Sequence, residues 1–305
     1  MSEIKHLIIG CGDVGRRIAS QLIESGEDSG SILGLVNSQK SKVGSEKLGI
    51  RSAQIDLDES DLNSSGFEKS WSEQTVCYYL VPPQKQGITD LRTRLLLSFL
   101  RETTTPPEKL PNKPPKKVVL ISTTGVYGDC KGEWVTEHSP TKPQTERGQR
   151  RLDSEHQWAE WATDHNVPLV ILRVPGIYAN SRIPRERIAK RIPVVNATEC
   201  GYTNRIHADD LAHVAITAML ADRQYEIYNA TDGTPGKITE YLQAACEILG
   251  EDPLPEISMQ QAREQLSAGM LSYLGESRRI SNEKMLNDLK ITLSYPNFKE
   301  GLKFG

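Results

Sequence analysis

The chain has 305 residues, enough for one large or two modest domains, so a mini-protein held together by disulfides is excluded. Hydrophobic residues make up 37% and charged residues 25% of the sequence, a composition typical of globular proteins and not of disordered chains. The 37 Lys and Arg residues are balanced by 40 Asp and Glu, and the net charge of -3 favours neither nucleic acid nor an anionic membrane as a partner.

Cysteine usage and the first residues both indicate a cytoplasmic protein. The cysteines are odd in number, scattered and without a CxxC pair, which is typical of reduced thiols: Cys11, Cys77, Cys130, Cys200 and Cys246. The first apolar stretch is too short for a signal peptide or a membrane span. The six histidines form no cluster with zinc-ligand spacing, so we expect no metal.

Short apolar runs alternate with amphipathic stretches up to about residue 174, a pattern typical of βαβ units. Six strands are predicted, at Lys5–Ile9, Ile32–Val36, Ala53–Leu57, Val76–Val81, Lys117–Ser122 and Val167–Arg173. Helices are predicted at Val14–Ser25, Asp90–Glu102 and Arg151–Asp164, with core faces that include Leu91, Leu95, Phe99, Trp158, Trp161 and Ala162. This order predicts an α/β fold, a doubly wound parallel sheet.

Two segments depart from that alternation. Residues 103–116 are rich in proline and lysine, and they are read either as an exposed connector or as a ligand for an aromatic-lined groove. After Pro175 the pattern becomes irregular. We therefore expect a first domain at 1–174 and a smaller lobe at 175–305.

The most informative motif is a GxGxxG that follows the first strand and opens the first helix. Gly10 permits a tight turn, Gly12 lets the backbone approach a pyrophosphate, and Gly15 lets helix and strand pack closely. The helix start at Asp13 and Val14 offers unpaired amides and a positive dipole. The motif predicts a dinucleotide site; the alternative is that the glycines serve only the geometry of the turn.

The end of the second strand bears on the type of dinucleotide. A site for NAD usually has a carboxylate there for the ribose 2′-hydroxyl, whereas this sequence has Asn37, Ser38, Gln39 and Lys40. Lys40 with Asn37 and Ser38 could accept a 2′-phosphate, which favours NADP(H) over NAD(H), although neutral ends also occur with NAD. Asp56, followed by Leu57, could accept the adenine amino group or cap the next turn.

Several segments follow one another in an order that is found in a known family. They are LIIGCGDVGRRIA at 7–19, VCYYLVPP at 76–83, LISTTGVYGD at 120–129, VTEHSPTKP at 135–143, LRVPGIYAN at 172–180, RIHADDLAHVAI at 205–216 and YNATDGTP at 228–235. Together they resemble the short-chain dehydrogenase/reductase superfamily, in particular its atypical or extended NAD-dependent epimerase/dehydratase-like branch. The resemblance covers nearly the whole chain.

The resemblance implies a Rossmann domain for the dinucleotide and a small lobe over a small-molecule substrate, with 205–235 returning to the Rossmann domain. Pro82 and Pro175 are expected to contact the cofactor. Thr123, or its neighbour Thr124, corresponds to the hydroxyl residue that holds the reacting oxygen, where a donor stabilises developing negative charge. The alternative is that Thr123 serves strand propensity alone.

The sequence departs from the family at the Tyr-x-x-x-Lys pair, because Arg147 and Arg151 occupy the two positions. An arginine is effectively always protonated and cannot replace tyrosine as a general acid or base. Arg151 could still bind ribose hydroxyls as the lysine does. Arg147 could stabilise an oxyanion, clamp a substrate carboxylate or phosphate, or lie on a solvated helix face.

Three other side chains are candidates for proton transfer, and one for anion binding. Tyr127, Tyr178 and His207 lie in segments that should border the site, although the counterpart of Tyr127 is usually structural in the family. His207 could equally be a helix-entry residue with Asp209 as the N-cap. Tyr178, Arg205 and His207 are the candidate substrate contacts, with Arg205 suited to an anionic group.

Two functions are therefore compatible with the sequence. One is an NAD(P)-dependent oxidoreductase or epimerase/dehydratase-like enzyme; the other is a catalytically silent NADP(H)-binding sensor that lost the Tyr/Lys pair. Relatives in the extended branch often form homodimers through the helices that match 90–102 and 151–164. The apolar residues of these helices could instead face only the sheet.

Overall fold

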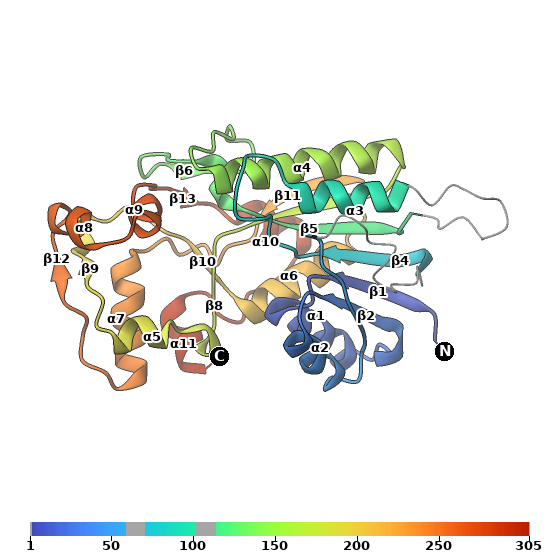
Figure 1. Cartoon of the computed structure of the whole chain (residues 1–305), viewed down its shortest axis with the longest axis horizontal. Coiled ribbons are helices and arrows are strands. Elements are labelled where there is room, and N and C mark those ends of the chain that lie inside the picture. The colour runs from blue at the N-terminus through green and yellow to red at the C-terminus, as the bar shows by residue number, and fades with distance from the viewer. Residues whose placement is uncertain (1, 59–70, 102–113, 305) are drawn as a thin grey trace. The chain divides into compact units, whose positions relative to one another are not determined.

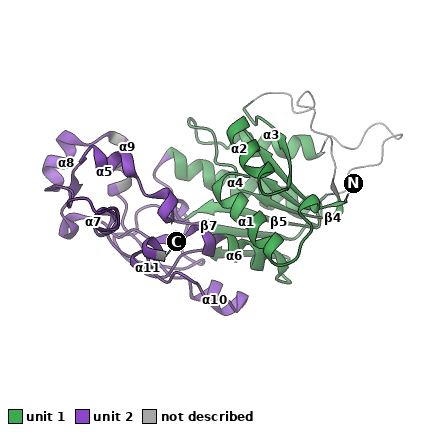
Figure 2. Cartoon of the chain, turned by 90° about the horizontal axis from the view of Figure 1, so that it is seen from below, with its two compact units in different colours: residues 1–123, 146–173, 212–228 green, residues 124–145, 174–211, 229–305 purple. Residues whose placement is uncertain are grey.

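The computed structural model describes residues 2–58, 71–101 and 114–304 (Figure 1). The chain divides into two compact units, each formed by separate stretches of sequence (Figure 2). Unit 1 comprises residues 1–123, 146–173 and 212–228; unit 2 comprises residues 124–145, 174–211 and 229–305.

Unit 1 contains a seven-stranded sheet with the order β11-β7-β5-β4-β1-β2-β3. Its strands are β1 (Ile4–Ile9), β2 (Ile32–Val36), β3 (Arg51–Gln54), β4 (Trp71–Tyr79), β5 (Lys117–Thr123), β7 (Leu169–Val174) and β11 (Tyr225–Asn229). Parallel pairing joins β1 to β2 and β4, β2 to β3, and β4 to β5. The predicted doubly wound parallel sheet is confirmed, and its strand order reverses between β1 and β4.

Helices cover both faces of this sheet (Figure 1). One face carries α1 (Asp13–Glu24) and α2 (Gln39–Glu46), and the other carries α3 (Leu91–Arg101) and α4 (Glu146–Asp164). The last unit 1 helix, α6 (Ala208–Leu220), is tied to the sheet because the Lys117 ammonium donates a 2.8 Å hydrogen bond to the Ala218 carbonyl.

The core of unit 1 corrects one predicted helix face. Trp158 and Trp161 of α4 are buried as predicted, and the Trp158 ring lies 5.2 Å from that of Tyr79. Leu91, however, is 53% exposed, while Leu96 and Leu97 are buried. The α3 sequence is apolar at several adjacent positions, so its periodicity alone could not decide which side faces the sheet.

Several element boundaries also differ from the sequence prediction. The third strand ends at Gln54 instead of Leu57, because Asp56 begins a turn in which its carboxylate accepts a hydrogen bond from the Asp58 amide. Helix α4 starts at Glu146, five residues before the predicted start, on a polar turn with no apolar periodicity. The polar helix α2 and the edge strand β11 were not predicted, since neither shows a strong apolar repeat.

Unit 2 is built from short elements. Its two-stranded parallel sheets pair β10 (Arg205–His207) with β8 (Gly176–Tyr178), β12 (Glu256–Ile257) with β9 (Val194–Val195), and β13 (Arg279–Ile280) with β6 (Trp134–Val135). Its helices are α5 (Arg185–Ala189), α7 (Ile238–Leu249), α8 (Met259–Gln265), α9 (Ala268–Leu274), α10 (Glu283–Leu289) and α11 (Phe298–Phe304). One core cluster includes Tyr178, Tyr241, Phe298 and Leu302.

In the described part of the chain, none of the helices is both long and apolar enough to span a bilayer. The same residues contain no cluster of three or more His, Cys, Asp or Glu side chains suited to a metal ion. Residues 103–113 of the predicted proline-rich connector lie outside the described residues.

Candidate functional site

The glycine turn lies at the point where the sheet order reverses. The amides of Gly10 and Cys11 donate to the Leu35 carbonyl at the end of β2, at 3.0 and 2.8 Å. Gly10 has a φ of +85°, and a Cβ atom there would lie 3.0 Å from the backbone nitrogen of Val81, just after β4. Glycine is needed at this position for both reasons. The turn therefore lies where ligands bind in open α/β sheets.

The other two glycines of the motif have different surroundings. A Cβ at Gly15 would lie 3.0 Å from the Ile8 side chain, so this glycine allows α1 to pack on β1. A Cβ at Gly12 would meet only the Gly10 carbonyl, at 3.9 Å, so the Gly12 backbone faces open space. Gly12 is the N-cap of α1 and supplies no side-chain acceptor to the first-turn amides. This arrangement suits an anion at the helix N-terminus.

Cys11, inside the motif, is a packing residue. Its side chain is buried, and a Cβ at Gly34 of β2 would lie 2.9 Å from its sulfur. The Ser45 hydroxyl of α2 is 3.6 Å from the same sulfur. Burial raises the pKa of the thiol, which counteracts the effect of the nearby helix dipole. Cys11 therefore joins the glycine turn to β2 and α2.

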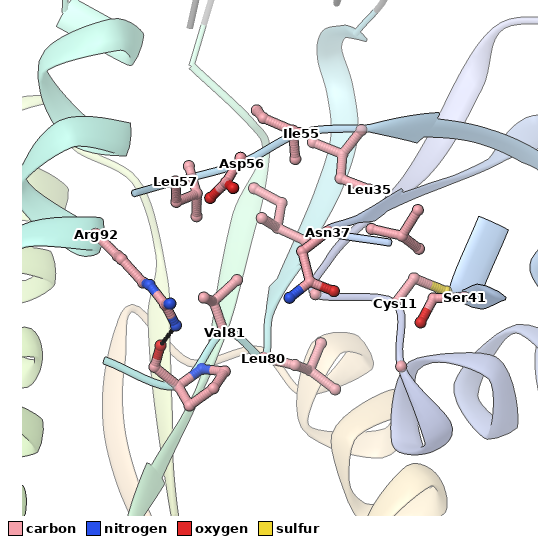
Figure 3. A pocket seen from close by; sticks show the side chains of 15 residues that line it. Cys11, Leu35, Asn37, Ser41, Ile55, Asp56, Leu57, Leu80, Val81 and Arg92 are labelled. Atoms are coloured by element: carbon pink, nitrogen blue, oxygen red, sulfur yellow. Dashed lines mark hydrogen bonds between the residues drawn. The ribbon is translucent and has the colours of Figure 1, made fainter. Parts of the chain in front are cut away.

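A cavity of about 180 Å³ opens beside this turn, entirely within unit 1 (Figure 3). The predicted cofactor residues that line it are Gly10, Gly12, Asn37, Asp56, Leu57 and Pro82. Figure 3 shows Asn37 and Ser41 on one side, Arg92 on the other, and Asp56 and Leu57 between them. The cavity thus brings together the residues that follow β1, β2, β3 and β4.

The remaining predicted cofactor residues lie outside this lining. Asp13, Val14 and Gly15 form the first turn of α1, and Pro175 lies between β7 and β8, in unit 2. Ser38 is the N-cap of α2, and its hydroxyl accepts a 3.3 Å hydrogen bond from the Ser41 amide. Lys40 follows in the first turn of α2 and is exposed.

The sequence motifs left the role of Asp56 undecided and did not identify Arg92. The Asp56 carboxylate accepts a 2.9 Å hydrogen bond from the Asp58 amide, so it caps the turn, and it also lines the cavity. Arg92 was not identified from the sequence, because it belongs to no motif and lies on a helix whose position depends on the fold. Ser41 was missed for the same reason, since α2 itself was not predicted.

Thr123 ends β5 beside a buried ion pair. Glu155 of α4 accepts a 2.5 Å hydrogen bond from the Ser122 hydroxyl and a 2.7 Å bond from the Arg173 guanidinium of β7. Both charged side chains are buried. These bonds hold the central part of α4 against β5 and β7. Arg151 lies in this part of the helix, one turn before Glu155.

The two arginines that are predicted to occupy the positions of the family's Tyr and Lys differ in environment. Arg147 is exposed in the first turns of α4. Arg151 is half-buried, and its Nη1 donates a 2.9 Å hydrogen bond to the Val81 carbonyl after β4. Burial lowers the pKa of Arg151, but a guanidinium starts so far above neutrality that it stays charged. Arg151 therefore supports the segment that lines the cavity.

Tyr127 is in the interior of unit 2. Its side chain is 1% exposed, and its hydroxyl donates a 2.8 Å hydrogen bond to the Asn229 side-chain oxygen. The backbone amide of Asn229 in turn donates to the Glu137 carboxylate at 2.8 Å. These bonds connect two stretches of unit 2, residues 124–145 and the segment that begins at Asn229, which is a structural role.

The three candidate substrate residues are also buried in unit 2. The Tyr178 and His207 rings pack edge to face at 5.2 Å, and the Arg205 guanidinium lies 4.4 Å from the centre of the Tyr241 ring. The His207 Nδ1 accepts a 3.3 Å hydrogen bond from the Asp209 amide. Burial raises the pKa of Tyr178 further from neutrality. Their packing accounts for them as core residues, and their role toward a substrate stays a prediction.

Comparison with known proteins shows what the chain is similar to. The model of the NAD dependent epimerase/dehydratase family matches residues 92–231. A search among curated proteins gives no match. A functionally unknown conserved protein from Silicibacter pomeroyi is 24% identical, with 98% of this chain and 96% of that chain covered and a TM-score of 0.78.

Two enzymes of that family have the same fold. UDP-glucose 4-epimerase from Thermotoga maritima, solved with UDP-glucose, is 17% identical, with coverage of 98% and 96% and a TM-score of 0.75. The dTDP-glucose 4,6-dehydratase from Bacillus anthracis, solved with NAD, is 15% identical, with coverage of 98% and 94% and a TM-score of 0.73. Residues 92–231 therefore match the NAD dependent epimerase/dehydratase family, the whole chain has the fold of these structures, and the predicted resemblance is confirmed.

Proposed function

We propose that this chain is an NAD(P)-dependent oxidoreductase or epimerase/dehydratase-like enzyme that binds its dinucleotide in unit 1. One observation carries the proposal. The Gly12 backbone faces open space at the start of α1, and the adjoining cavity is lined by the residues that follow β1 to β4. A pyrophosphate at the helix N-terminus and an adenosine in the cavity fit this arrangement.

The residues of the chain fit the parts of such a cofactor. The backbone around Gly12 and the first-turn amides at Val14 and Gly15 would hold the pyrophosphate. Asp56 and Leu57 would contact the adenine. The N-terminus of α2 provides no carboxylate, and the exposed Lys40 lies in its first turn, so a 2′-phosphate and hence NADP(H) are favoured.

The bound nicotinamide would supply the hydride acceptor or donor. Thr123, at the end of β5, would donate a hydrogen bond to the substrate oxygen whose charge changes during hydride transfer. Arg151 would bind ribose hydroxyls, and Arg147 would hold an anionic group of the substrate. Because two structural relatives carry nucleotide sugars in their names or ligands, a nucleotide sugar is the first substrate class to test.

Calorimetric titration with NADPH, NADH, NADP+ and NAD+ tests the cofactor assignment. Gly12→Ala introduces a methyl group that meets nothing of the chain closer than 3.9 Å, so we expect an unchanged melting temperature and a loss of binding by about 100-fold or more. Lys40→Ala should weaken NADPH and leave NADH unaffected. If none of the four dinucleotides binds the wild type, the glycine motif is architectural and the proposal fails.

A second candidate function is a dinucleotide-binding sensor without chemistry. Arg147 and Arg151 at the positions of the family's proton-transfer pair favour it, as does the hydrogen bond that commits Arg151 to the Val81 carbonyl. A sensor would bind NADPH without turnover, and the cofactor would change its affinity for a protein partner. Turnover in a screen of carbonyl compounds and nucleotide sugars, lost in Thr123→Val, would exclude the sensor.

The double substitution Arg147→Tyr with Arg151→Lys also distinguishes the two functions, because it restores the family's pair instead of removing a residue. It should damage an existing reaction of an enzyme, whereas in a sensor it could only create activity. We also propose that the protein is located in the cytoplasm, since all five cysteines are free. We further propose that it forms a homodimer, and light scattering tests this.

A further inference from the structure

Arg92 is held by three hydrogen bonds at the edge of the cofactor cavity. Its Nε donates to the Asp58 Oδ1 at 2.7 Å, and its Nη2 donates to the Asp58 Oδ2 at 2.5 Å. Its Nη1 donates to the Pro82 carbonyl at 2.8 Å. The side chain comes from the first turn of α3, whose N-terminus is capped by the Asp90 carboxylate through the Thr93 amide. These contacts fix the plane of the guanidinium.

The hydrogen bonds of Arg92 join three segments of the chain that border the same cavity. Asp58 follows Asp56 and Leu57 after β3, Pro82 follows Val81 after β4, and Arg92 itself belongs to α3. In Figure 3 the Arg92 side chain reaches along the cavity toward the Pro82 carbonyl, opposite Asn37 and Ser41. A flat, rigid side chain therefore forms one wall of the space proposed for adenosine.

The charge balance indicates what this wall can bind. Arg92 and Asp58 form a bidentate ion pair, and their hydrogen bonds raise the pKa of Arg92 and lower that of Asp58. The pair is thus neutral as a whole, so it has no net charge for a phosphate. What remains available is the planar face of the guanidinium, which stacks on aromatic rings. A purine base fits this wall better than an anion.

We infer that Arg92 is an adenine-binding residue, on whose guanidinium face the purine ring of the dinucleotide stacks. The inference rests on the proposed function, because it assigns a contact to the cofactor proposed above. Asp58 and the Pro82 carbonyl hold the guanidinium in place for this contact and are positioning groups. The contact is independent of the hydrogen bond proposed between Asp56 and the adenine amino group.

Calorimetry with four variants tests the inference, using whichever of NADP+ and NAD+ binds the wild type more tightly. Arg92→Ala should weaken binding roughly 3- to 30-fold, the range for a contact between a cation and an aromatic ring. Arg92→Lys should weaken it nearly as much, because lysine keeps the charge but lacks the planar face. Asp58→Asn should cause a smaller loss, since it only releases the guanidinium. Arg94→Ala is the matched control, an exposed arginine of the same helix, and should have no effect.

Analogues of the same dinucleotide sharpen the test. The hypoxanthine analogue lacks the adenine amino group but keeps the purine face, so Arg92→Ala should weaken it by the same factor as the parent. The cytosine analogue has a smaller ring, so Arg92→Ala should weaken its binding by a smaller factor. Melting temperatures identify any variant that fails to fold, and Arg92→Lys then carries the test.

Three results would overturn the inference. Unchanged affinity in Arg92→Ala would exclude any contact with the cofactor. Full affinity in Arg92→Lys would show that charge, and hence a phosphate, is what Arg92 recognises. A wild type that binds neither dinucleotide would overturn both the inference and the proposed function, whereas the first two results leave the proposed function intact.

Discussion

Two buried carboxylates, Glu155 in unit 1 and Asp232 in unit 2, have opposite surroundings. In unit 1, Glu155 has a buried cationic partner in Arg173 and a hydroxyl donor in Ser122. In unit 2, Asp232 is 6% exposed, and within the described residues its Oδ2 has no hydrogen-bond partner. Burial raises the pKa of Asp232 to about 7, against the opposing effects of the Thr234 amide and Arg205. The comparison shows that the environment of a buried acid depends on the partners that the fold supplies.

The largest expected effect is the loss of the paired carboxylate in unit 1. Glu155→Gln should lower the free energy of unfolding by about 3–5 kcal/mol, because the buried Arg173 charge then has no counter-charge. Urea denaturation measures this loss. The double variant Glu155→Leu with Arg173→Met should lose less than the single one, because both charges are removed. A single variant that loses less than about 1 kcal/mol would contradict the contrast between the units.

The carboxylate of unit 2 should behave differently with pH. The unfolded state releases its proton near the ordinary pKa of about 3.9, and the folded state releases it only near 7. Below pH 4 the contribution of Asp232 to stability is fully present, and it is lost as the pH rises from about 4 to 7. Asp232→Asn stays neutral, so its stability relative to the wild type should rise between these values by on the order of 2–4 kcal/mol.

Chemical unfolding of both proteins at about pH 4.5 and about pH 8 measures this difference. Other titrating groups contribute equally to both proteins and cancel. Asp252→Asn replaces an exposed carboxylate of the same unit and is the control, with no expected change of relative stability. An equal stability difference at the two pH values would mean that Asp232 is ionised in the folded protein throughout.

The smallest expected effect concerns the hydroxyl of Tyr127 in unit 2. Tyr127→Phe removes its hydrogen bond to Asn229 and should cost about 1–3 kcal/mol of unfolding free energy. If turnover is found, this variant should retain it, since the hydroxyl is already committed to the fold. Turnover that disappears while the stability is unchanged would instead assign Tyr127 to catalysis.

Much of unit 1 could be predicted because its determinants are local. The GxGxxG motif predicted the turn after β1, since Gly10 and Gly15 are required by contacts within the strand–turn–helix segment and with the adjacent strand, and Gly12 leaves the start of the helix open. Apolar runs predicted six of the strands of the sheet. The helix α2 and the strand β11 were missed because their sequences are polar or mixed, and their stability comes from packing against neighbours.

The residues of the candidate site divide in the same way. Asn37, Asp56 and Leu57 could be placed by counting from strand ends, and they line the cavity. Arg92 could not, because its contacts to Asp58 and Pro82 join segments that only the folded sheet brings together. The buried packing of Tyr178, Arg205 and His207 was equally hidden, since a polar residue on a short strand has no periodicity to predict burial.

The sequence by itself determined the family resemblance, the parallel sheet and the dinucleotide motif. It also predicts that Arg147 and Arg151 occupy the positions of the family's tyrosine and lysine. Only the tertiary structure decided which charged side chains are paired, which are exposed and which line the cavity. The physical reason is that glycine geometry and apolar spacing act over a few residues, whereas ion pairs and burial depend on segments far apart in the chain.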